Sequence, residues 1–224
     1  MALIFAFLAG ICIMGSQLFT AIADDYRTDK QISQIDKAFL EQSIKDNKNI
    51  EQKPIDFSGL EDFLGNIEFK EAGIKTTLRD NASYYALDHS AGLYTDSAPI
   101  DQKGTSIILG HNYHNGSNDV FTRLDEVKPS HTVDIKYLPT KTLYRYEVQA
   151  VYHIDKLELN QAVTNADKNT TDNTVLFVSC DDTFYQGESN GRILVLAKLK
   201  ETLKSIPNTT TNKSDKGVNH GSSN

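Results

Sequence analysis

Short runs of β-forming residues separated by turn signals fill the middle of this 224-residue chain, and they constrain its fold most. Such an alternation of runs and turns is typical of an all-β protein. Seven runs and one short helix within residues 55–203 predict a closed barrel or a sandwich. The runs are NIEFKEAGI (66–74), SYYAL (83–87), GTSIILG (104–110), HTVDIKYL (131–138), LYRYEVQAVYHI (143–154), NTVLFVSC (173–180) and GRILVLAKL (191–199).

Two of these runs are predicted to be buried on both faces. Residues 175–178 and 193–197 are apolar without alternation, as strands covered on both sides are. The run 143–154 instead alternates, and its even-numbered residues 144–150 are expected to face the core. Apolar spacing over residues 119–127 predicts a short helix that is capped by the first of them, an aspartate.

Three further segments are predicted outside the runs. Residues 1–23 carry no charged side chain, and at about 1.5 Å per residue they can cross a hydrocarbon core of roughly 30 Å as a membrane anchor. The alternative is a secretory signal peptide, because residues 21–23 resemble a cleavage site. Residues 24–54 carry one apolar stripe and are predicted to form a helical stalk or linker. Residues 204–224 have almost no large apolar side chains and predict a disordered tail.

Both interpretations of the first segment export the rest of the chain, and we expect a single-pass protein of the cell membrane with its main domain outside the cell. The net charge of −7 argues against a nucleic-acid partner, since binding phosphates needs a basic face. We expect no metal and no other cofactor. The acidic surface would tolerate Ca²⁺, but no carboxylate cluster has the spacing of a calcium loop. His111 and His114 lack the further ligands that zinc requires.

One cysteine stands where a reactive thiol would be useful. Of the two cysteines in the chain, Cys12 lies in the apolar first segment, which leaves Cys180 single in the exported part. Cysteines in an oxidising setting usually occur in even numbers, so a single one is a candidate reactive group. Cys180 ends a buried run and precedes two acids, Asp181 and Asp182. We expect these acids, which oppose thiolate formation, to face outwards or to be neutralised by a nearby arginine.

That arginine is Arg192, which opens the last run. If the runs 173–180 and 191–199 pair as antiparallel neighbours, Cys180 and Arg192 lie at the same end of the sheet. A guanidinium beside a thiol favours the thiolate and can donate to an oxyanion. The alternative is a simple ion pair between Arg192 and one of the two acids, because surface ion pairs are common.

A cysteine nucleophile also needs a proton acceptor, usually a histidine. His111 follows an apolar run, so the core fixes its backbone while its side chain reaches the rim, as for Cys180. The other five histidines lie in loops, in the tail or in runs without special neighbours, where structural roles suffice: His89, His114, His131, His153 and His220.

A histidine after one run, a cysteine at the end of a later run and an arginine at the start of the next follow one another along the chain. These motifs and their order resemble those of the sortases, the cell-wall transpeptidases of Gram-positive bacteria. The resemblance rests on residues 104–116, GTSIILGHNYHNG, on 120–127, VFTRLDEV, and on LFVSCDD followed by GRILVLAKL, and it covers residues 65–199. It implies a closed eight-stranded β-barrel in residues 55–203, which many sortases precede with a membrane anchor. The subfamily stays open between class B and classes A and D.

The resemblance also implies roles for particular residues. Cys180 matches the nucleophile, His111 the catalytic histidine, and Arg192 the arginine that steadies substrate and oxyanion. Ser179, where a threonine is usual, and Asn112 are implied to contact the substrate. A further histidine of many sortases is replaced here by leucine at position 93.

The implied activity is cleavage of an LPXTG-like sorting signal through a thioacyl enzyme, followed by transfer to an amine. The partners would be surface proteins with a C-terminal sorting signal, and an acceptor amine of a peptidoglycan precursor or a pilin. Two alternatives remain: an anchored β-barrel binding module without catalysis, and a secreted thiol hydrolase.

Overall fold

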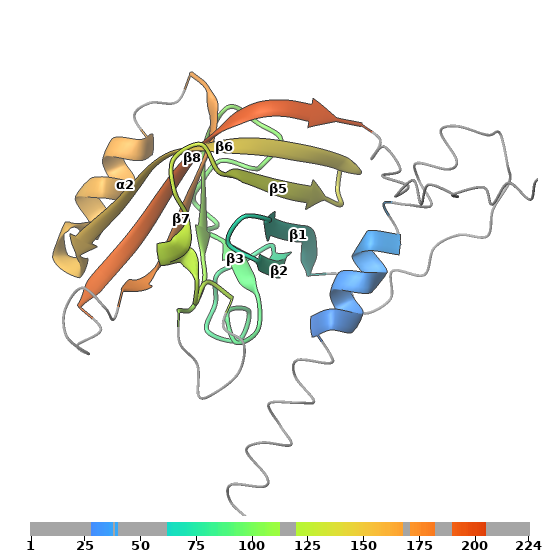
Figure 1. The fold of residues 1–224 in the computed structure, drawn as a ribbon, viewed down its shortest axis with the longest axis horizontal. Coiled ribbons are helices and arrows are strands. Elements are labelled where there is room, and N and C mark those ends of the chain that lie inside the picture. The colour runs from blue at the N-terminus through green and yellow to red at the C-terminus, as the bar shows by residue number, and fades with distance from the viewer. Residues whose placement is uncertain are drawn as a thin grey trace, which may run out of the picture.

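A closed barrel of eight strands forms the body of this computed structural model (Figure 1). The structure describes residues 28–37, 39, 62–112, 120–167, 171–181 and 190–204. The predicted all-β class and the closed eight-stranded barrel are confirmed. The strands are β1 (Phe63–Phe69), β2 (Ile74–Arg79), β3 (Ala91–Leu93), β4 (Gly104–Leu109), β5 (Thr132–Tyr137), β6 (Thr142–Asp155), β7 (Asn173–Asp181) and β8 (Gly191–Leu203).

The order of strands around the barrel differs from their order in the chain. It runs β1-β2-β3-β4-β7-β8-β6-β5, and pairing of β1 with β5 closes the circle. The pairs β2–β3 and β4–β7 are parallel, and the others are antiparallel. Since β4 and β7 run in the same direction and β8 runs back, the ends of β4 and β7 meet the start of β8 at one rim.

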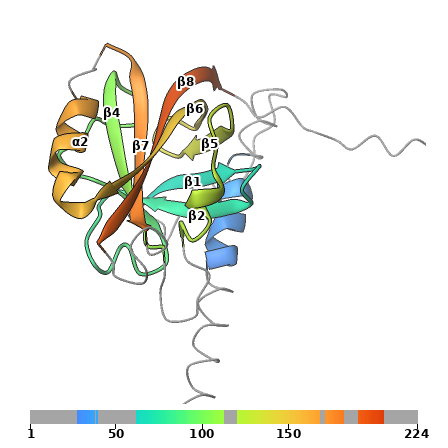
Figure 2. The same ribbon diagram turned by 60° about the vertical axis from the view of Figure 1, so that its left-hand side comes forward.

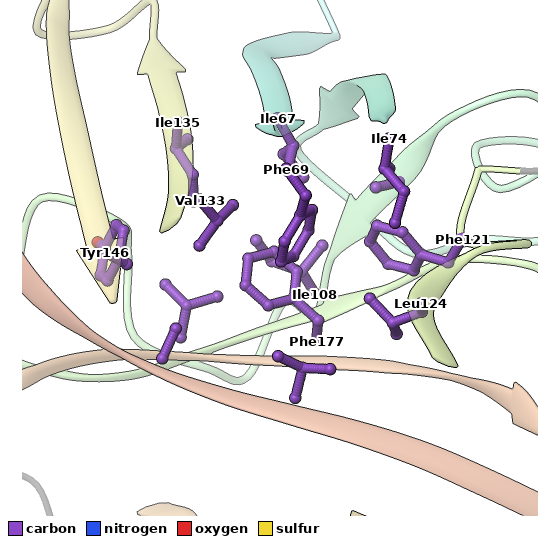
Figure 3. Packing of buried hydrophobic residues seen from close by; sticks show 14 of the residues in the cluster. Ile67, Phe69, Ile74, Ile108, Phe121, Leu124, Val133, Ile135, Tyr146 and Phe177 are labelled. Atoms are coloured by element: carbon purple, nitrogen blue, oxygen red, sulfur yellow. The ribbon is translucent and has the colours of Figure 1, made fainter. Parts of the chain in front are cut away.

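Alternate side chains of the strands fill the inside of the barrel (Figure 3). The ring of Phe177 packs edge to face on Phe69 and Phe121, at centroid distances of 4.9 and 5.9 Å. Nearby, the buried hydroxyl of Tyr146 donates to the side chain of Asn173 at 2.8 Å. Burial raises the pKa of Tyr146, so its hydroxyl stays protonated. These contacts fix the inner face of β7, on which the rim depends.

Helix α2 (Leu159–Asp167) covers part of the outside of the barrel (Figure 2). Its apolar stripe packs on residues that we call the outer cluster: Ile107, Leu109, Leu176, Val178, Leu194 and Leu196. The hydroxyl of Thr105 also donates to the carbonyl of Ala166 at 2.9 Å. The sheet of β4, β7 and β8 is therefore buried on both faces, which confirms the prediction for residues 175–178 and 193–197.

Several predicted elements differ in the structure. The run 66–74 is two strands of a hairpin, because a turn with Gly73 at φ 66° separates β1 from β2. The run 83–87 is a series of turns and not a strand, and Tyr84 and Tyr85 are 73% and 86% exposed, so only Ala86 of this run is buried. The predicted helix 119–127 is only a 3-10 turn, η1 (Leu124–Glu126).

Part of the predicted helical segment 24–54 is described, and residues 28–37 form a helix. Its apolar stripe packs on the barrel, where Ile35, Phe39, Phe63 and Leu138 form a small cluster. Asp36 of this helix bonds Lys75 at 2.9 Å and also bonds Lys136. Burial alone would raise the pKa of Asp36, but the two lysines hold this pKa below its usual value. The helix is thus fixed to the barrel by apolar and charged contacts.

The other predicted segments fall outside the described residues. They are the anchor, 1–23, most of the segment 24–54, and residues 205–224 of the predicted tail. Among the helices that the structure describes, none has the length and apolar character needed to cross a membrane.

Candidate active site

Three predicted residues meet at the rim where β4 and β7 end. Cys180 and Arg192 are direct partners across the antiparallel β7–β8 pair. On the other side of β7, the N–H of Gly110 donates to the carbonyl of Val178 at 3.1 Å, which continues the β4–β7 pairing beyond Leu109. His111 and Cys180 each come two residues after the last pair of this parallel register, Leu109 and Val178, so their backbones lie at the same height along the sheet. The prediction that Cys180 and Arg192 lie at the same end of the sheet is confirmed.

Cys180 and Arg192 share one face of the sheet. Successive residues of a strand point to opposite faces, so residues two apart share a face. Val178 before Cys180 and Leu194 after Arg192 belong to the outer cluster, so the thiol and the guanidinium lie on the outer face of the rim. His111 stands two residues after Leu109 of the same cluster, just beyond the end of β4. All three residues are partly exposed.

Contacts on the inner face hold this rim together. The hydroxyl of Ser179 is buried and donates to the carbonyl of Gly110 at 2.8 Å, which ties β7 to the end of β4. The carbonyl of His111 accepts from the N–H of Phe121 at 2.9 Å. Asn112, the other residue implied to contact substrate, accepts at its carbonyl from Thr122 at 2.8 Å. The backbone around the histidine is therefore fixed from two sides.

A comparison with models of protein families gives one match over most of the barrel. The model of the sortase domain matches residues 67–200, which include all eight strands in whole or in part and the complete rim.

The chain belongs to the sortase family.

Solved sortases share the fold of this one at low sequence identity. Sortase A of Listeria monocytogenes is 20% identical with a TM-score of 0.54, over 66% of this chain and 93% of that one. Sortase D5 of Clostridium perfringens, a transpeptidase, is 20% identical with a TM-score of 0.54, over 78% and 98%. Sortase C1 of Streptococcus agalactiae is 22% identical with a TM-score of 0.53, over 77% and 89%. No curated protein sequence matches the chain.

The acid after the cysteine of this sortase does not face outwards, so the first alternative of that prediction is wrong for Asp181, and neutralisation of one acid by Arg192 stays a prediction. Asp181 is 3% exposed and lies on the face opposite Cys180, because it is the next residue of the strand. Its Oδ2 lies 2.5 Å from Nδ1 of His153. The sequence alone gave His153 no special neighbour. Asp182 lies outside the described residues.

The remaining histidines do not join the rim contacts that the structure describes. His89 lies 3.3 Å from the carboxylate of Asp88, and Nδ1 of His131 accepts from the N–H of Lys128 at 3.3 Å. His114 and His220 fall outside the described residues. Leu93, which replaces a further histidine of many sortases, is an apolar core residue of β3. Within the described ranges, no group of three or more metal-ligating side chains could hold a metal ion.

Gly110 is the point at which the barrel fixes the backbone of His111. An added Cβ there would lie 2.5 Å from the buried ring of Phe121. We expect Gly110→Ala to lower the free energy of unfolding by about 1–3 kcal/mol, because the ring must move in a filled core. Urea unfolding measures this change. The matched control is Ser106→Ala on the same strand, whose buried hydroxyl has no hydrogen-bond partner among the described residues. It should leave stability unchanged or raise it, and equal stability of the two variants would contradict the prediction.

Proposed function

We propose that this sortase is a cysteine transpeptidase that cleaves an LPXTG-like sorting signal and transfers the protein to an amine. The observation that carries the proposal is the pairing of Cys180 with Arg192 across β7 and β8, with His111 just beyond the end of the neighbouring strand β4. Cysteine-based acyl transfer needs a thiol, a group that moves protons, and a donor for the oxyanion. The rim supplies one side chain of each kind.

In the first step, the Cys180 thiolate attacks the threonine carbonyl of the sorting signal. Negative charge develops on the carbonyl oxygen, and the guanidinium of Arg192 donates hydrogen bonds to it. When the intermediate collapses, the peptide C–N bond breaks and His111 gives its proton to the leaving amine of the next residue. The product is a thioester between Cys180 and the shortened protein.

In the second step, an amine takes the place of the leaving group. His111, now neutral, takes a proton from the incoming amine as it attacks the thioester carbonyl. The C–S bond breaks, Cys180 leaves as the thiolate, and a new amide forms. The acceptor is an amine of a peptidoglycan precursor or of a pilin. No metal or other cofactor takes part in either step, and no nucleic acid is a partner.

Other residues have supporting roles in this scheme. Ser179 acts through the backbone, because its hydroxyl holds Gly110 and therefore the start of the segment that carries His111. Asn112 follows the histidine, is partly exposed, and is proposed to contact the substrate. Residues 1–23 are proposed to anchor the protein in the membrane by a single span, with the barrel outside the cell.

A product analysis tests this function against its two alternatives. The full chain is incubated with a sorting-signal peptide, with and without triglycine, and the products are identified by mass spectrometry. We expect cleavage after threonine and a new peptide that carries the glycines. Free acid as the only product in the presence of triglycine would indicate a thiol hydrolase. An intact peptide that still binds would indicate a binding module.

A further inference from the structure

The contact between His153 and Asp181 joins two strands that are not neighbours. In the sheet, β8 lies between β6 and β7. His153 of β6 is opposite Ile193 of β8, and Asp181 of β7 is opposite Gly191 of β8. Strands two positions apart are separated by roughly 9–10 Å. The side chains cross this distance along the inner face and approach to 2.5 Å.

Two features of the backbone make this crossing feasible. A register shift between Val148 and Ala150 in β6 changes which residues face inwards, as a β-bulge does. Before the shift Val148 belongs to the inner core, and after it Val151 does, so His153 also faces inwards. The second feature is Gly191, which occupies the inner-face position between Asp181 and β6 and has no side chain to fill the space.

The contact lies directly beneath the candidate active site. Asp181 is the next residue after Cys180, and Gly191 is the residue before Arg192. Arg192 is also tied to this position, since its Nη1 donates to the carbonyl of Gly191 at 2.6 Å. The His153–Asp181 contact therefore fixes the backbone at the end of β7 and the start of β8, which carry the thiol and the guanidinium.

The burial of Asp181 makes its partner important. Its side chain is 3% exposed, whereas that of His153 is 37% exposed. Loss of the contact with His153 removes stabilisation from a buried charge, and this favours a shift of the carboxylate or of the strand that carries it. Either change moves the backbone of Cys180, which is covalently attached to that of Asp181.

We propose that His153 and Asp181 are a positioning pair for the Cys180 thiol. The pair joins the ends of β6 and β7 under β8, and it keeps the Asp181 carboxylate on the opposite face of the sheet from the sulfur. A small displacement of a reacting group costs much of the rate of a reaction. This role rests on the proposed function of Cys180 as the nucleophile.

The test compares His153→Leu, Asp181→Asn and the double variant in two assays. The first is alkylation of Cys180 by iodoacetamide in the folded full chain, and the second is the kcat and KM of transfer to triglycine. Leucine cannot donate a hydrogen bond, so we expect His153→Leu to slow alkylation and to lower kcat about 10- to 100-fold with little change in KM, because a displaced thiol costs about that much. The double variant should lose no more than either single variant, since the two residues act as one unit.

Two further variants separate positioning from general loss of structure. His153→Lys keeps a donor toward Asp181 on a partly exposed site, and it should recover much of the kcat that His153→Leu loses. Asp172→Asn is the matched control, because it removes the charge of the 2.8 Å contact between Lys198 of β8 and Asp172, which lies next to the start of β7 and far from the rim. It should leave alkylation and kcat unchanged. Thermal unfolding of each variant sets a temperature at which all are folded.

The outcomes for the pair and for the proposed function are distinguishable. If wild-type protein transfers the peptide and His153→Leu matches it in both assays, the pair has no positioning role and the proposed function stands. Failure of His153→Lys to recover any activity also counts against positioning. If the wild type transfers nothing, the proposed function fails. Alkylation still decides whether the pair controls the thiol.

Discussion

Replacing Cys180 with alanine is expected to reduce transfer of a sorting peptide to triglycine by at least about 1,000-fold, to the background rate. Removal of a nucleophile abolishes the covalent intermediate, and the rest of the site cannot substitute for it. The measurement is the initial rate of product formation at saturating peptide. Trapping of the thioester on the wild type by mass spectrometry, and its absence from the variant, adds direct evidence for the intermediate.

The fold provides a clear control for this variant. Cys180 is only partly buried and points to the outer face, so alanine leaves no large cavity. The variant should therefore unfold at the same temperature as the wild type and should still bind the peptide. Cleavage that persists in Cys180→Ala would show that this thiol is not the nucleophile.

Replacing His111 with glutamine is expected to lower kcat for transfer by about 100- to 10,000-fold, the usual contribution of a group that moves protons in the transition state. Glutamine keeps a polar side chain of similar reach but cannot carry the proton between the two steps. Alkylation of Cys180 in this variant reports separately on whether the imidazole assists the thiol before substrate binds.

The matched control for His111→Gln is His131→Gln. His131 accepts a hydrogen bond from the backbone of Lys128, three residues earlier in the chain, and it precedes β5, which is not adjacent to β4, β7 or β8. This variant should keep wild-type kcat. Equal rates for His111→Gln and His131→Gln would remove His111 from the mechanism.

The strands that could be predicted from the sequence are those that are buried on both faces of the sheet. The strands β7 and β8 are apolar on both faces, and their position in the sequence could be predicted within a few residues. By contrast, β3 has only three residues and exists because β2 and β4 bond it on either side. Helix α2 contains Asn and Thr, which favour helices weakly, and it is held by packing on the outer cluster.

The same distinction applies to the candidate site. Antiparallel pairing of two consecutive runs was enough to place Cys180 opposite Arg192, and the end of an apolar run was enough to select His111. The His153–Asp181 contact could not be found this way. It depends on the register shift in β6, which the residues around Gln149 do not predict. It also depends on β8, which follows both partners in the sequence but lies between their strands in the sheet.

The parallel pairing of β4 with β7 also has a consequence for the order of folding. The hydrogen bond between Ser179 and Gly110 closes a loop of 69 residues, and contacts of such long range form late, because chain entropy opposes them. Arg192 can approach Cys180 through a local hairpin, but the histidine reaches it only when the barrel closes. Until the barrel closes, Cys180 therefore lacks the histidine beside it, and the proposed arrangement of the three side chains is complete only when folding ends.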